Sequence, residues 1–322
     1  MLSFAILYIM ELAKYLPSKP LMVACVILLL LTWLGLFGYY IYQKNVAVTS
    51  APQVLAAQET VLLRGDAEKV NFHLPLPRSE TTPKLGAESY LAVDLNTGMT
   101  LTEKNTDTKL QVASLTKMMT VYVGLQHLGG NDDLVMAGNT SYTNPIVGFR
   151  TGQKVKLSDL VESIMVCSAN DAAIELARAV SIKTGKPFSD LMNESAYDLG
   201  MTDSHFDNPN GFDSPQNYTT AKDLKVLASR LYAEGLVSLY GRQNTAVFGT
   251  KALSCEATNG LLAIDTDIMA LKTGSTELAK QAMITVIENK GHPILLMVLK
   301  SPDRDQDMKK LKEHILTNWE WK

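Results

Sequence analysis

Ser114 and Lys117 stand three residues apart in the stretch Ala-Ser-Leu-Thr-Lys-Met-Met-Thr at 113–120. Apolar residues recur at helical spacing after the serine, so the pattern predicts a helix that begins near Ser114 and buries one face. Positions i and i+3 share a helix face, which brings the serine hydroxyl near the lysine amine. A neighbouring base is one way to turn a serine hydroxyl into a nucleophile. The same spacing is also typical of a helix cap followed by a solvated lysine, so the pair needs partners before it indicates catalysis.

Two short motifs later in the chain supply candidate partners. Ser168-Ala-Asn170 lies within a region predicted as a pair of helices, 157–180, and Lys272-Thr-Gly274 ends an apolar strand candidate. Each triplet by itself is more often an ordinary turn or strand end. In this order, however, the three motifs match the set Ser-x-x-Lys, Ser-x-Asn and Lys-Thr-Gly of penicillin-binding proteins and serine β-lactamases.

The residues around the motifs narrow the resemblance. From about Glu88 to its C-terminus the chain resembles the low-molecular-mass penicillin-binding proteins, which are serine-type D-alanyl-D-alanine carboxypeptidases. The matching stretches are 113–120, 168–173, 208–211, 259–262 and 271–276. The resemblance implies a three-layer α+β fold of the β-lactamase/transpeptidase type, with an antiparallel sheet flanked by helices and a helical subdomain.

The resemblance also implies catalytic roles. Ser114 would attack the carbonyl between two terminal D-alanines of a peptidoglycan stem peptide and form an acyl-enzyme, with Lys117 as its base. Ser168 would relay a proton to the leaving amine, and Asn170 would orient Lys117 and bind the peptide. The backbone N–H groups of Ser114 and Ser275 would form the oxyanion hole. β-Lactams would act as covalent inhibitors of the same serine.

The substrate's terminal carboxylate would be received by Lys272 and Thr273, while Gly274 permits close approach of the strand backbone. Arg304 resembles a family arginine near this carboxylate, but a solvated arginine at a helix start explains it equally well. A free lysine is charged at pH 7, so Lys117 acts as a base only if burial or a second cation such as Lys272 lowers its pKa. No cofactor and no metal is expected, because the five histidines form no HxH or HExxH motif.

Rival activities share the three motifs. Class A β-lactamases also use a glutamate that activates the deacylating water, whereas the loop at 200–217 contains Asp203, Asp207 and Asp213 but no glutamate. An endopeptidase that cuts peptide cross-links would perform the same acyl transfer, and a wall-binding module with a dead site is the non-catalytic alternative. Ser275 and Lys280 depart from residues common in relatives, which leaves substrate preference and turnover open.

The elements that must position these residues are predicted from periodicity and turn signals. A hairpin is expected at 89–94 and 99–104, followed by the Ser114 helix and a loop-rich stretch at 131–157. Further helices are expected at 187–199, 220–234 and 304–321, and strands at 263–272, 282–288 and 294–299. Strands at both ends of the domain with helices between them indicate one antiparallel sheet built from distant segments.

The first 85 residues lie outside the resemblance. Residues 21–42 contain no charged side chain and are long enough to span a bilayer, so they predict a transmembrane anchor. Residues 1–20 would be cytoplasmic, 43–85 a stalk, and 86–322 the penicillin-binding domain outside the cytoplasm of a bacterial cell; a cleaved signal peptide is the alternative. The net charge of −3 shows no basic surface for nucleic acid. Cys25 lies in the apolar run, and whether Cys167 and Cys255 pair is left open.

Overall fold

The computed structural model describes residues 74–129, 133–137, 147–248 and 253–322. The predicted cytoplasmic segment, the transmembrane anchor at 21–42 and most of the predicted stalk lie outside these ranges. Within the described ranges, no helix is both long and apolar enough to cross a membrane.

The centre of the domain is a five-stranded antiparallel sheet with the order β3-β2-β10-β9-β8. Its strands come from both ends of the domain sequence, as predicted. In chain order they are β2 (Ser89–Asp94), β3 (Thr100–Lys104), β8 (Ile268–Thr276), β9 (Lys280–Asn289) and β10 (His292–Ser301). The predicted β2–β3 hairpin is confirmed, and its turn is closed by Gly98 at φ 72° and by the Asp94 carboxylate, which accepts the Thr97 N–H at 2.8 Å.

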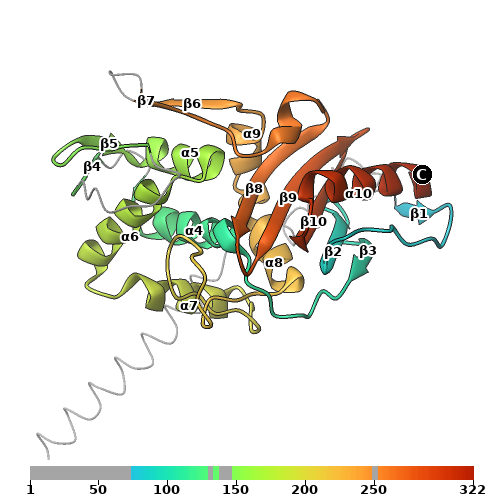
Figure 1. Ribbon diagram of the computed structural model, residues 1–322, viewed down its shortest axis with the longest axis horizontal. Helices are drawn as coiled ribbons and strands as arrows, with labels where there is room; N and C mark the ends of the chain where they lie inside the picture. Colours follow the sequence, from blue (N-terminus) through green and yellow to red (C-terminus); the bar gives the residue numbers. More distant parts are fainter. Residues whose placement is uncertain (1–73, 130–132, 138–146, 249–252) are drawn as a thin grey trace, which may run out of the picture. The chain divides into compact units, whose positions relative to one another are not determined.

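The sheet lies between two helical layers (Figure 1). Alternate residues of a strand point to opposite faces, and strand β10 is apolar on both faces. Ile294, Leu296 and Val298 pack with α10 (Arg304–Asn318) through Met308, Leu311 and Ile315. Leu295, Met297 and Leu299 belong to the larger core on the other face. The expected three-layer arrangement is therefore observed.

The larger core is built mainly by the helices between β3 and β8. These are α4 (Lys117–His127), α5 (Leu157–Cys167), α6 (Asn170–Thr184), α7 (Phe188–Asp198), α8 (Ala221–Ala233) and α9 (Leu236–Tyr240). Helix α4 packs against α5, α6, α7 and α8, and its first five residues are all buried. Except for α9, these helices match predicted segments. The first turn of α4, which begins at Lys117, is thus buried by the surrounding helices.

The first predicted late strand, 263–272, is wrong at its N-terminal end. A 3₁₀ turn, η3 (Gly260–Ala263), occupies its beginning, and β8 starts only at Ile268. The Asn259 side chain caps the turn by accepting the Leu261 N–H at 3.0 Å, and Asp265 accepts the Asp267 N–H at 3.1 Å. Side chains that bond nearby backbone groups favour turns over strands, and this local competition overrides the apolar run.

The predicted boundary at residue 86 and the predicted helix end at 321 are also corrected. Strand β1 (Pro75–Pro77) pairs with β11 (Trp319–Trp321), so part of the predicted stalk belongs to the fold of the domain. Proline is tolerated in a short edge strand but gives no strand signal. Two more short hairpins were not predicted, namely β4 (Asp133–Val135) with β5 (Lys154–Lys156), and β6 (Thr245–Phe248) with β7 (Leu253–Glu256).

The open question about the cysteines is answered by the structure, in which Cys167 and Cys255 form a disulfide. The bond joins the last residue of α5 to strand β7, and the two cysteines are 88 residues apart in sequence. Val166, Cys167 and Ala246 form a small buried cluster at this junction. The bridge therefore fastens the β6–β7 hairpin to the helix end that precedes Ser168.

Removal of this bridge by Cys255→Ser should lower the free energy of unfolding by about 2–4 kcal/mol, because the cross-link restricts the unfolded chain. Chemical denaturation under non-reducing conditions measures the change. Cys25→Ser, which leaves both bridge cysteines in place, is the matched control. Equal stability of wild type and Cys255→Ser would contradict a stabilising role for the bridge.

Candidate active site

Ser114 lies in a single 3₁₀ turn, η2 (Ala113–Thr116), that leads directly into α4. The expected helix therefore begins with a tighter turn than an α-helix, and Ala113 before the serine has φ 50°. Lys117 is the first residue of α4 and is completely buried. Its Nζ lies 2.9 Å from Ser114 Oγ. The predicted meeting of hydroxyl and amine is thus observed.

Two carbonyl oxygens hold the amine of Lys117 in place. Its Nζ donates to Asn170 Oδ1 at 2.7 Å and to the backbone carbonyl of Asn210 at 2.9 Å. Burial lowers the pKa of Lys117 to about 7, because the charged form loses its hydration. Repulsion by a second cation such as Lys272, the other predicted cause, is not needed to explain this lowered pKa. A neutral amine has two N–H donors and one lone pair, so the two carbonyls occupy its donors and its lone pair is left for the Ser114 hydroxyl.

Asn170 is presented by the break between two helices. Helix α5 ends at Cys167, Ser168 adopts the left-handed conformation with φ 60°, and α6 begins at Asn170. Ser168 and Asn170 are both almost fully buried. A non-glycine residue in this conformation is a local strain of the kind found at functional sites. The break brings the Ser-x-Asn motif to the start of α4, as predicted.

Asn210 was not predicted as a site residue, although the stretch 208–211 was recognised as a match to the family. The Asn208 side chain accepts the N–H groups of Asn210, Gly211 and Phe212 at 3.3, 2.8 and 2.9 Å, respectively. Gly211 has φ 79°, and a Cβ there would lie only 1.9 Å from the Ala113 carbonyl oxygen. The Asn-Pro-Asn-Gly turn is thus pressed against η2 and directs the Asn210 carbonyl at the lysine.

The Lys-Thr-Gly motif lies on β8, beside Ser114. Lys272 and Thr273 are buried, and a Cβ on Gly274 would lie 2.7 Å from the Val112 carbonyl oxygen and 3.0 Å from the Ser114 backbone nitrogen. Only glycine allows this strand to approach the serine so closely. Ser275 follows on the same strand, and it is solvent-exposed.

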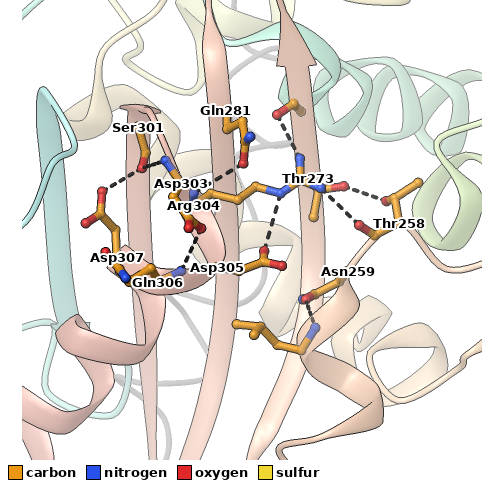
Figure 2. A network of polar contacts seen from close by, with 12 residues as sticks. Thr258, Asn259, Thr273, Gln281, Ser301, Asp303, Arg304, Asp305, Gln306 and Asp307 are labelled. Carbon is orange, nitrogen blue, oxygen red and sulfur yellow. Dashed lines mark hydrogen bonds and ion pairs between the residues drawn. The ribbon is translucent and has the colours of Figure 1, made fainter.

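Three cationic side chains gather along this edge of the sheet. Burial lowers the pKa of Lys272 well below its ordinary value, and repulsion by Lys117 and Arg304 lowers it further. Arg304, the first residue of α10, donates to the carbonyl oxygens of Gly274 and Thr258 at 3.0 and 3.1 Å (Figure 2). Its guanidinium therefore faces β8 and is only partly exposed, so the alternative of a solvated helix-start arginine is wrong.

Two of the three aspartates in the loop at 200–217, which contains no glutamate, bind partners outside the Ser114 site. Asp203 pairs with Lys109 at 3.1 Å. Asp213 accepts the Thr276 hydroxyl at 2.6 Å and the Leu278 N–H at 3.2 Å. Within the described ranges, no hydrogen bond joins any of the three aspartates to Ser114 or Lys117.

The departure at Lys280 has a structural counterpart, since this residue has φ 51°. Glycine adopts such a conformation without the steric cost that an L side chain meets. Lys280 is exposed and begins β9, so its side chain is accommodated at a strained backbone position.

Fold and site together place a serine hydroxyl beside a buried lysine amine, against the edge strand of an antiparallel sheet. The chain belongs to the D-alanyl-D-alanine carboxypeptidase family of S11 peptidases, whose family model matches residues 77–303. It is 31% identical to the D-alanyl-D-alanine carboxypeptidase DacA of Escherichia coli K12 over 228 residues, which is 66% of this chain and 55% of that protein. The chain thus matches little more than half the length of this relative.

Solved structures of similar fold include a transpeptidase and a penicillin-binding protein. The DD-transpeptidase of Streptomyces K15 has a TM-score of 0.66 and 27% identity, with 74% of this chain and 99% of that chain covered. Penicillin-binding protein D2 of Listeria monocytogenes, in an ampicillin-bound form, has a TM-score of 0.65 and 26% identity, with 74% and 100% covered. Each similarity covers about three quarters of this chain.

Gly274→Ala should slow acylation of Ser114 about 10- to 100-fold, because the new methyl group would push β8 away from η2 and misplace the reacting groups. The same overpacking should lower the free energy of unfolding by about 1–3 kcal/mol. Stopped-flow acylation by a chromogenic β-lactam measures the first effect and thermal melting the second. Gly260→Ala is the matched control, since its Cβ would meet only the Asp305 side chain at 3.3 Å. Unchanged acylation by Gly274→Ala would contradict the close-approach argument.

Proposed function

We propose that this chain is a membrane-anchored serine D-alanyl-D-alanine carboxypeptidase that removes the terminal D-alanine from peptidoglycan stem peptides. The observation that carries the proposal is the environment of the buried Lys117 amine. Its Nζ contacts Asn170 Oδ1, the Asn210 carbonyl oxygen and Ser114 Oγ. Membership of the carboxypeptidase family supports the substrate class.

In the acylation step, neutral Lys117 takes the proton of the Ser114 hydroxyl as Oγ bonds to the carbonyl carbon of the penultimate D-alanine. A pKa of about 7 leaves a large fraction of Lys117 neutral near pH 7, and a base matched to the working pH is the efficient choice. The developing oxyanion accepts hydrogen bonds from the Ser114 and Ser275 backbone N–H groups. Ser168 passes the proton to the departing D-alanine nitrogen.

Deacylation completes the cycle. Water attacks the ester carbonyl, Lys117 accepts a proton from this water, and the Ser114 oxygen leaves and regains its proton. The products are the shortened stem peptide, with a new carboxylate, and the restored serine. The same scheme with a cross-linked peptide as substrate would be endopeptidase activity, so the choice between the two lies outside the Ser114–Lys117 pair.

Recognition of the free peptide end rests on Lys272, Thr273 and Arg304. Burial and two neighbouring cations lower the pKa of Lys272, and an incoming carboxylate would oppose this effect by favouring the protonated form. Protonated Lys272 in turn disfavours a second positive charge on Lys117. Substrate binding would therefore place the proton on the recognition lysine and keep the catalytic lysine neutral.

We also propose that residues 21–42 anchor the chain in a bacterial cell membrane, with the catalytic domain outside the cytoplasm. The uncharged run of that length supports an anchor. The Cys167–Cys255 disulfide agrees with this side of the membrane, because disulfides persist mainly in oxidising compartments. Peptidoglycan is accessible there, and so are β-lactams, which would acylate Ser114.

The direct test is release of D-alanine from a pentapeptide ending in D-Ala-D-Ala, together with labelling by a fluorescent penicillin. The full-length protein should do both, and Ser114→Ala should lose at least about 10³-fold in each activity because the nucleophile is gone. Ser181→Ala, a change at another serine near the end of α6, is the control that should keep both activities.

Other outcomes point to the rival activities. Labelling that survives Ser114→Ala would refute the nucleophile. Rapid β-lactam hydrolysis without D-alanine release would identify a β-lactamase, and cleavage of cross-linked dimers without release from pentapeptide would identify an endopeptidase. A folded wild-type protein with no activity would be a binding module.

A further inference from the structure

Thr258 lies at the carboxylate-binding edge of the site but belongs to none of the three catalytic motifs. It follows strand β7, and its Oγ1 is 2.5 Å from Oγ1 of Thr273 in the Lys-Thr-Gly motif. Figure 2 shows the two hydroxyls facing each other, with Arg304 beside them. The contact joins two segments 15 residues apart in sequence. Thr258 is thus placed to act on a residue that we assign to substrate recognition.

The backbone of Thr258 is fixed from both sides. Its N–H donates to the Val166 carbonyl at 3.2 Å, which ties it to the end of α5. Its carbonyl accepts Nη2 of Arg304 at 3.1 Å. The disulfide at Cys255 lies three residues earlier, and the capping residue Asn259 follows directly. The backbone of Thr258 is therefore held beside Thr273 by contacts that do not involve the two hydroxyls.

The number of hydroxyl protons determines which threonine donates in the hydrogen bond between Thr258 and Thr273. Each threonine hydroxyl has one proton to donate, whereas an ionised carboxylate can only accept. When Thr273 donates its proton to the substrate carboxylate, its contact with Thr258 must use the proton of Thr258. In that arrangement Thr258 donates to Thr273, and a hydroxyl that accepts a hydrogen bond becomes a stronger donor.

We propose that Thr258 is a positioning residue that turns the Thr273 hydroxyl proton toward the substrate's terminal carboxylate and so sets the preference for peptides with a free carboxyl end. The proposal rests on the proposed function, in which Thr273 contacts that carboxylate. Arg304 reinforces the arrangement, because its two terminal nitrogens bind the carbonyls of Thr258 and Gly274 on either side of the contact.

The test compares acylation of the full-length protein by benzylpenicillin, which carries a carboxylate, with acylation by its methyl ester, which does not. In Thr258→Val the hydroxyl is lost and the shape is kept. We expect the second-order rate constant for benzylpenicillin to fall about 5- to 20-fold and that for the ester to change less than about twofold. Thr258→Ser should retain the wild-type ratio of the two rate constants.

A double-mutant comparison isolates the route through Thr273. Thr273→Val should lower the same ratio, and adding Thr258→Val to it should lower the ratio no further, since the hydroxyl that Thr258 orients is already absent. Thr258→Ala provides a second variant without the hydroxyl, and thermal melting verifies that each variant is folded.

Three results would overturn the proposal. The first is a wild-type ratio of the benzylpenicillin and ester rate constants in both Thr258→Val and Thr258→Ala. The second is an equal fall of both rate constants in these variants. The third is a double variant in which the effects of Thr258→Val and Thr273→Val on the ratio are fully additive. Failure of the wild-type protein to be acylated by either compound would instead contradict the proposed function, so the two failures are distinguishable.

Discussion

The constraint on which the site depends is the burial of a lysine amine. An ammonium group removed from water loses several kcal/mol of hydration, and a paired negative charge is needed to offset that loss. Among the described residues, Lys117 has carbonyl oxygens as partners and no carboxylate. The charged form is therefore disfavoured, which is the physical reason for a pKa near 7. A lysine in this state can take a proton from serine, whereas a solvated lysine at the same sequence position could not.

The surrounding structure maintains that burial. Helix α4 is packed by other helices around its first turn, the break at Ser168 supplies the Asn170 amide, and the Asn208 turn supplies the Asn210 carbonyl. The glycines at 211 and 274 allow a turn and a strand to approach η2 to distances that no side chain permits. Catalytic geometry and close packing are thus produced by the same contacts, and a loss of packing at either glycine would also disturb the chemistry.

Much of this site could be predicted from the sequence, because the three motifs specify residue types that act together. Ser114, Lys117, Asn170, Lys272 and Gly274 lie where the resemblance implied. Asn210 and Thr258 were missed for a physical reason: one acts through its backbone carbonyl and the other through a neighbouring threonine, and neither leaves a residue-type pattern. For Asn210, the Asn-Pro-Asn-Gly turn was a detectable signal.

Parts of the fold could not be predicted from the sequence. The pairing of Cys167 with Cys255 depends on tertiary contacts that periodicity does not encode. Strand β1 was hidden by its prolines, and β8 was misplaced because side-chain caps at Asn259 and Asp265 competed with an apolar run.

The central claim is that burial makes Lys117 the base, and the pH dependence of acylation tests it most directly. Benzylpenicillin has no group that titrates between pH 5 and 9, so the acid limb of its second-order rate constant reports the enzyme. As the pH rises through the lowered pKa, Lys117 loses its proton and becomes able to accept that of Ser114, so the rate should rise with a midpoint near pH 7 and then level off. A rate that is independent of pH between 5 and 8, or an acid limb near the ordinary lysine value of about 10.4, would contradict the account.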